Sequence, residues 1–125
     1  MRVYLAGPFR KGDQFVNVRE AVLVGVRLRR AGHVPVIPHF YCLAHYLLPM
    51  PDDFWMSWGM EELAACECLV RLPGESVGSD AEVERAKVLG LPVYYGVEAF
   101  LEQVTVRDNQ EVRDGVDGDF LDYNL

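Results

Sequence analysis

A serine, a glycine and a glutamate are spaced S-x-G-x-x-x-E in residues 76–82, between an apolar segment and a helical pattern. The start of a helix presents free backbone N–H groups, here from Gly78 through Ser79 to Asp80, together with the positive end of the helix dipole. Such a site attracts a phosphate or stabilises an ionised carboxylate, and an ionised Glu82 would be a competent nucleophile. The spacing therefore indicates anion binding, covalent catalysis or both.

The same residues also fit a purely structural pattern. Ser79 and Glu82 form the sequence S-x-x-E of a capping box, in which the glutamate side chain accepts the backbone N–H of the serine. On spacing alone, the capping box is the preferred interpretation of Glu82.

Two further groups of polar residues contain side chains of the types that bind metal ions. His39, Cys42 and His45 do not have the spacing of a common zinc site and lie among leucine and tyrosine, which favours packing or loop hydrogen bonds. The acidic segment 114–119 lacks the alternating order and the terminal glutamate of a calcium loop. We therefore expect neither a metal nor a cofactor.

Composition restricts the class of protein and its partners. The net charge of −7 argues against binding to a nucleic-acid polymer, although a free nucleotide remains compatible with it. There is no run of about 20 apolar residues such as a membrane span needs, and no signal pattern, so we expect a cytoplasmic protein. Cys42, Cys66 and Cys68 are interpreted as reduced thiols.

The elements that would position these residues alternate along the chain. Short apolar segments predict strands at 2–6, 34–37, 68–72 and 92–95, and Pro35 suggests that the second strand lies at an edge. Apolar periodicity predicts a first helix with Asn17 as its N-cap and Gly32 after its end. Further helical patterns cover 42–47, 52 or 53 to 65, 79–89 and 97–103.

This alternation predicts a single-domain α/β fold with a flavodoxin-like or Rossmann-like parallel sheet of about four to five strands between helices, over residues 1–104. Ligands of such folds bind beyond the carboxyl ends of the strands, which directs attention to the loops at 7–16, 38–52 and 73–79. The first loop lacks the G-x-G-x-x-G turn of a dinucleotide-dependent oxidoreductase. Residues 105–125 are acidic and lose the apolar periodicity, which predicts a flexible tail.

Several segments occur in an order that resembles the nucleoside 2-deoxyribosyltransferase-like superfamily, near its 2′-deoxynucleoside 5′-phosphate N-hydrolases and uncharacterised bacterial and phage groups. They are Y-L-A-G-P at 4–8, the Asn-led helix ending in A-G-H, V-x-x-P, L-P-G, S-x-G-x-x-x-E-x-x-x-A and L-G-x-P-V. The resemblance covers about residues 2–97. It implies that Glu82 is the covalent nucleophile and outweighs the capping box.

The resemblance also implies roles for residues around the first and third predicted strands. Tyr4 and Arg10 match a tyrosine and an arginine that hold sugar and phosphate, and Gly7 lies between them in the same substrate-binding segment. Ser76 and Gly78 match the phosphate loop, with Ser79 beside them. The expected ligand is a nucleoside or nucleotide.

The chain departs from the superfamily at two places. Pro8 stands where many members have a serine, and 58–60 offer no aspartate where members have one. We take Glu61 as the substitute acid, with Glu62 and Asp53 as alternatives that the sequence does not separate.

The expected activity is cleavage or transfer at the N-glycosidic bond of a (2′-deoxy)nucleoside or its 5′-monophosphate through a glycosyl-Glu82 intermediate, with water or a second base as acceptor. The alternative, supported by the missing aspartate, is a non-catalytic nucleotide-binding or partner-binding module. Because the superfamily assembles into oligomers, and one small core does not readily bury the aromatic residues of 40–58, we expect a homodimer or higher oligomer. In that setting the end of the tail, 120–125, is an alternative lid over a neighbouring site.

Overall fold

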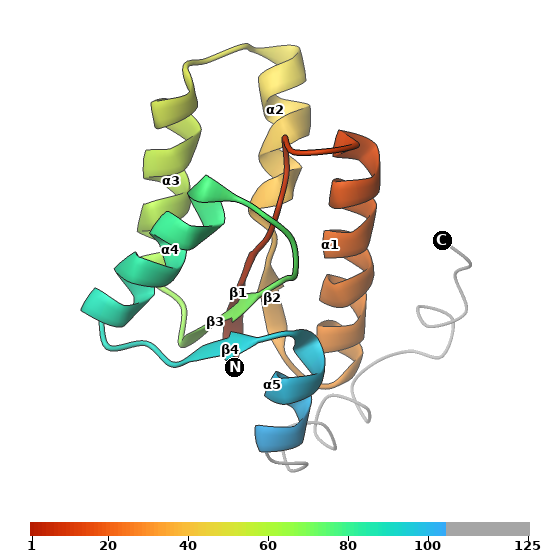
Figure 1. Cartoon of the computed structure of the whole chain (residues 1–125), viewed down its shortest axis with the longest axis vertical. Coiled ribbons are helices and arrows are strands. Elements are labelled where there is room, and N and C mark those ends of the chain that lie inside the picture. The colour runs from red at the N-terminus through yellow and green to blue at the C-terminus, as the bar shows by residue number, and fades with distance from the viewer. Residues whose placement is uncertain (105–125) are drawn as a thin grey trace.

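A four-stranded parallel sheet forms the centre of the molecule (Figure 1). In the computed structural model, which describes residues 1–104, its strands are β1 (Arg2–Ala6), β2 (Val34–Val36), β3 (Cys68–Arg71) and β4 (Val93–Tyr95), in the order β2-β1-β3-β4. Tyr4 at the middle of β1 pairs with Val36 on one side and Leu69 on the other. The predicted parallel α/β sheet is confirmed, with four strands. Both the flexible tail and its lid alternative fall on 105–125, outside the described residues.

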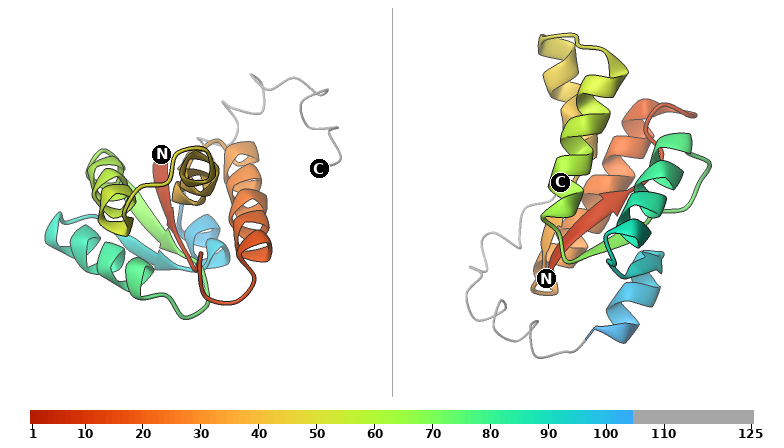
Figure 2. Two further views of the ribbon diagram at one scale, coloured as in Figure 1. Left: turned by 90° about the horizontal axis from the view of Figure 1, so that it is seen from above. Right: turned by 90° about the vertical axis from the view of Figure 1, so that its left-hand side faces the viewer.

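Helices cover both faces of this sheet, as the view from above shows (Figure 2). They are α1 (Gln14–Arg30), α2 (Tyr41–Leu47), α3 (Asp52–Ala64), α4 (Val77–Val88) and α5 (Val97–Gln103), and a 3₁₀ turn, η1 (Pro38–Phe40), precedes α2. The helix predicted at 97–103 agrees to the residue, and the others agree within a few residues. Pro35 lies in β2, an edge strand of the sheet, as predicted.

Alternate residues of β1 divide the core into two apolar clusters. Val3 and Leu5 pack with buried residues of α1 and α5, whereas Tyr4 and Ala6 pack with buried residues of α3 and α4. This alternation follows from the period of two along a strand. It places the side chain of Tyr4 on the same side of the sheet as α4.

The start of α1 differs from the sequence prediction. Asp13, not Asn17, is the N-cap, and its carboxylate accepts the backbone N–H groups of Phe15 and Val16 at 2.9 and 3.2 Å. The side-chain amide of Asn17 donates to the carbonyls of Phe9 and Lys11 at 2.9 and 2.8 Å. Asn17 therefore fastens the loop after β1 onto the first turn of α1.

Among residues 1–104, no helix combines the length and the apolar character that crossing a membrane requires.

Candidate active site

A pocket of about 520 Å³ opens at the carboxyl edge of the sheet. All three loops expected to lie near a ligand contribute to it: the loop after β1, the segment of η1 and α2 up to the start of α3, and the segment that leads into α4. Its volume falls within the range of about 300–1,000 Å³ that is typical of small-molecule sites. Tyr4, Arg10, Ser76, Gly78 and Glu82 all line this pocket.

Glu82 and Tyr4 meet at the buried end of the pocket. The hydroxyl of Tyr4 donates a hydrogen bond to Oε2 of Glu82. Tyr4 is fully buried and Glu82 is only 8% exposed. Tyr4 reaches this place because its position in β1 directs it towards α4, and Glu82 because it faces the sheet from the second turn of that helix.

The capping box predicted for Ser79 and Glu82 is wrong. Ser76 is the N-cap of α4, and its Oγ accepts the backbone N–H of Ser79 at 3.1 Å. The observed N-cap thus lies three residues before the predicted one, which moves Glu82 beyond the first turn. Its carboxylate is left for a partner outside the helix, which is Tyr4.

Burial controls the protonation of this pair. It raises the pKa of Glu82 to about 7, although the hydrogen bond from Tyr4 and the positive charge of Arg71 act in the opposite direction. Burial and the adjacent Glu82 raise the pKa of Tyr4, so this hydroxyl stays protonated and remains a donor. Near neutral pH the pair therefore switches between a neutral carboxyl and a carboxylate held by a phenol.

Arg71 was not predicted from the sequence. Its side chain is 10% exposed, and its guanidinium donates to the carbonyls of Leu72 and Gly74 and pairs with Asp80 at 3.1 Å. It braces the turn between β3 and α4 while favouring the ionised form of Glu82. The sequence alone does not distinguish an arginine with this role from a solvent-exposed arginine at the end of a strand.

Gly59 of α3 leaves the space that the pair occupies. A Cβ built at Gly59 would lie 2.8 Å from the Tyr4 hydroxyl and 3.6 Å from Oε2 of Glu82. A separation under 3 Å from a buried hydroxyl cannot be accommodated without movement of the tyrosine. Residues 58–60 lack the expected aspartate, and a steric constraint explains the glycine at position 59, because a larger residue there would collide with the Tyr4 hydroxyl. A Cβ at Gly7, also in the lining, would similarly lie only 2.9 Å from the Cβ of Leu72.

The acids expected to help Glu82 are not in the pocket. Glu61 and Asp53 are exposed and outside its lining, and Glu62, also outside it, accepts a hydrogen bond from the Trp58 indole at 3.2 Å. Asp52, which was not predicted, does line the pocket. Asp52 is the first residue of α3 and the last residue of the loop 38–52 that was expected to lie near a ligand, and this position could have identified it as a site residue.

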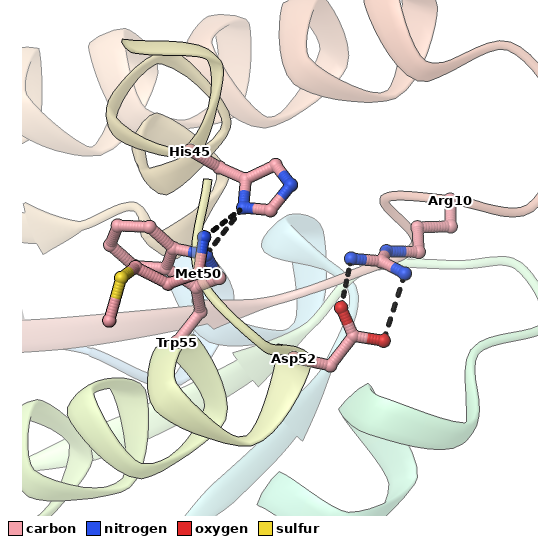
Figure 3. A network of polar contacts seen from close by, with 5 residues as sticks. All are labelled: Arg10, His45, Met50, Asp52 and Trp55. Atoms are coloured by element: carbon pink, nitrogen blue, oxygen red, sulfur yellow. Dashed lines mark hydrogen bonds and ion pairs between the residues drawn. The ribbon is translucent and has the colours of Figure 1, made fainter. Parts of the chain in front are cut away.

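Arg10 lies at the mouth of the pocket in a two-pronged ion pair with Asp52 (Figure 3). Lys11 forms a second pair with Glu75, at 2.8 Å. Nearby, Nδ1 of His45 accepts the indole N–H of Trp55 at 2.8 Å and the backbone N–H of Met50 at 3.3 Å. These two contacts connect His45 of α2 to the segment before α3 and to α3 itself.

Aromatic rings form one wall of the pocket. Tyr41 and Trp55, both in the lining, stack with ring centres 5.9 Å apart and planes 27° apart, and Trp55 stacks on Trp58 at 6.0 Å and 24°. Stacked rings present flat apolar area that suits a planar heterocycle.

His39 is a buried member of the lining. Its Nε2–H donates to the carbonyl of Pro8 at 3.0 Å, while Nδ1 is buried and has no hydrogen-bond partner within residues 1–104. Burial lowers the pKa of His39, so this ring is neutral. In the part of the chain that the structure describes, no three histidine, cysteine or carboxylate side chains are arranged to hold a metal ion.

Comparison with known proteins agrees with this architecture. The family model described as "Domain of unknown function (DUF4406)" matches residues 1–95. A solved 2-deoxyribosyltransferase from the psychrotolerant bacterium Bacillus psychrosaccharolyticus is similar with a TM-score of 0.55 and 24% sequence identity, over 76% of this chain and 71% of that one. No curated protein sequence matches. The expected deoxyribosyltransferase-like fold is thereby confirmed.

Proposed function

The chain belongs to the family described as domain of unknown function DUF4406, and we propose that it cleaves or transfers the N-glycosidic bond of a nucleoside or its 5′-monophosphate. One observation carries the proposal: a buried Glu82, hydrogen-bonded by Tyr4, lies in a pocket of nucleoside size with a stacked aromatic wall. The solved structure that shares the fold is described as a 2-deoxyribosyltransferase, which is consistent with this activity.

In the proposed reaction, the Glu82 carboxylate attacks the anomeric carbon of the sugar. The C–N bond breaks, its electron pair leaves with the base, and a glycosyl ester forms on Glu82. Water or a second base then attacks the same carbon and loses a proton, which neutralises the departed base; the ester bond breaks, and the carboxylate returns with net retention of configuration. Tyr4 holds Oε2, which orients the attacking oxygen and keeps the leaving carboxylate stabilised.

A panel of nucleosides and 5′-monophosphates, each followed for release of free base, tests this function. We expect Glu82→Gln to abolish release and Glu84→Gln to leave it intact, because Glu84 is an exposed residue of the same helix that pairs only with Lys87 among the described residues. Release that persists in folded Glu82→Gln protein would refute the proposed role of Glu82.

A non-catalytic nucleotide-binding module is the second candidate, and one observation favours it. The other two carboxylates of the described lining, Asp52 and Glu75, are engaged in ion pairs, and the expected acids lie elsewhere. Nucleoside binding without base release by wild-type protein would select this candidate.

We further propose that the chain assembles into a homodimer or higher oligomer. Large apolar side chains are exposed near the mouth of the pocket at the start of α1 and along α2; they are Phe15, Leu43, Tyr46, Leu47 and Leu48. No residue of α2 is buried in the single chain. Contact between copies is the arrangement that would cover this surface.

A further inference from the structure

The two cations of the described pocket lining are already neutralised. Arg10 is bound by both oxygens of Asp52, and Lys11 lies 2.8 Å from Glu75. All four residues line the pocket. The guanidinium expected from the sequence to hold a phosphate therefore already binds a carboxylate through two of its N–H groups.

The remaining charges of the lining do not favour a phosphate either. Glu82 adds a third carboxyl group, and its ionised form is the one required of a nucleophile. Of the two histidines of the lining, burial lowers the pKa of His39, and His45 directs Nδ1 to the N–H groups of Met50 and Trp55. A phosphate dianion would thus enter a site with two cations and up to three carboxylates.

The start of α4 offers little compensation. Its first residues line the pocket, and a free helix N-terminus attracts anions. Here the Ser79 N–H is taken by Ser76 Oγ. The charged side chains at this end of the helix are already paired, Glu75 with Lys11 and Asp80 with Arg71, so they leave no free cation to reinforce phosphate binding there.

An uncharged sugar avoids this conflict. A carboxylate has about four acceptor positions, so Asp52 can keep both contacts to Arg10 and still accept a hydrogen bond from a hydroxyl. A 5′-phosphate would either bind the remaining N–H groups of Arg10 beside the negative charge of Asp52, or displace that carboxylate and leave it unpaired next to a dianion. The side chains of Asp52 and Glu75 are 71% and 74% exposed, so neither acid is required to support the core.

We propose that the pocket accepts an uncharged nucleoside and discriminates against its 5′-monophosphate, with Asp52 and Glu75 as the residues that determine this specificity. This inference rests on the proposed function, which allows either a nucleoside or a 5′-monophosphate as substrate; the inference selects the nucleoside.

Titration calorimetry with matched pairs of nucleoside and 5′-monophosphate tests the inference. The titrations use wild-type protein and, so that turnover adds no heat, the Glu82→Gln background. The variants are Asp52→Asn, Glu75→Gln and the double variant. The matched control is Asp53→Asn, which removes the same charge from the first turn of the same helix at an exposed residue outside the pocket.

Wild-type protein is expected to bind the nucleoside on the order of tenfold more tightly than the monophosphate. The double variant should gain on the order of tenfold in monophosphate affinity, with a gain that shrinks as salt is added, while nucleoside affinity changes by less than about threefold. Asp53→Asn should change neither affinity.

The outcomes separate this inference from the proposed function. Tighter binding of the monophosphate by wild-type protein, no gain in the double variant, or an equal gain in Asp53→Asn would overturn the inference even if base is released. The expected binding pattern without base release would support the inference and refute the proposed catalysis. Binding of neither ligand would overturn both.

Discussion

The Tyr4 hydroxyl donates a hydrogen bond to a carboxyl group 78 positions further along the chain, that of Glu82. β1 supplies the phenol and α4 the acid, and Gly59 of α3 leaves the space in which they meet. This contact has consequences for stability and for catalysis that can be measured separately.

Stability should depend on pH through Glu82. Its pKa is about 7 in the folded protein, against 4.5 as its ordinary value. Between these values the folded chain keeps a proton that the unfolded chain has lost, so the free energy of unfolding falls as pH rises, by up to about 3 kcal/mol. In Glu82→Gln this contribution is absent. Urea unfolding at several pH values should show wild type losing stability relative to the variant between about pH 4.5 and 7, and parallel profiles would contradict the assignment.

Tyr4→Phe removes the hydrogen bond that lowers the pKa of Glu82. The carboxyl should then ionise at higher pH, and the rising limb of the pH profile of kcat/KM should move upward by about one unit. Tyr95→Phe, at an exposed tyrosine outside the pocket, serves as the control. A limb that stays in place while activity falls would mean that Tyr4 supports the fold without acting on Glu82.

Gly59→Ala tests the space between the two residues. Replacing glycine by alanine within a helix normally stabilises it by up to about 1 kcal/mol, but here the added Cβ would lie 2.8 Å from the Tyr4 hydroxyl. We expect a loss of stability of about 1–3 kcal/mol and a fall in base release of more than about tenfold. Ser57→Ala, at an exposed position of the same helix, should do neither. A stabilised and fully active Gly59→Ala protein would rule out the steric account.

Deletion of 105–125 tests the proposed domain boundary and the proposed role of the tail. The two core clusters and the pocket lining described above are built from residues 1–104, so we expect the shortened chain to fold with a Tm within a few degrees of the full chain. Unchanged mass in solution and unchanged base release would leave the tail no part in the site. Lost activity in an intact oligomer would support the lid instead.

The sequence was sufficient to predict the helices and strands, but not to predict several of the contacts between side chains. The α/β alternation and α5 follow from local periodicity, and the loops that line the pocket follow from the rule that ligands bind at the carboxyl edge of a parallel sheet. Helix starts were less certain, because Asp13 and Asn17, and likewise Ser76 and Ser79, are equally suitable caps by residue type. Only the packing of α1 and α4 against the sheet selects between them.

The acids near the pocket illustrate the same limit. Glu61 and Asp52 both belong to α3, and the rotation of that helix about its axis decides which of them reaches the ligand. That rotation is set by buried contacts such as those of Gly59 and Leu63, which local patterns do not specify.

Trapping the covalent intermediate tests the central claim most directly. Wild-type protein is mixed with a 2′-deoxynucleoside that it cleaves, quenched in acid during turnover, and examined by mass spectrometry of the intact chain and of its peptides. The account predicts the added mass of one deoxyribosyl group on the peptide that contains Glu82, and no such addition in Glu82→Gln. Base release by wild-type protein with the sugar attached to another residue, or with no enzyme-bound sugar at any quench time, would contradict it.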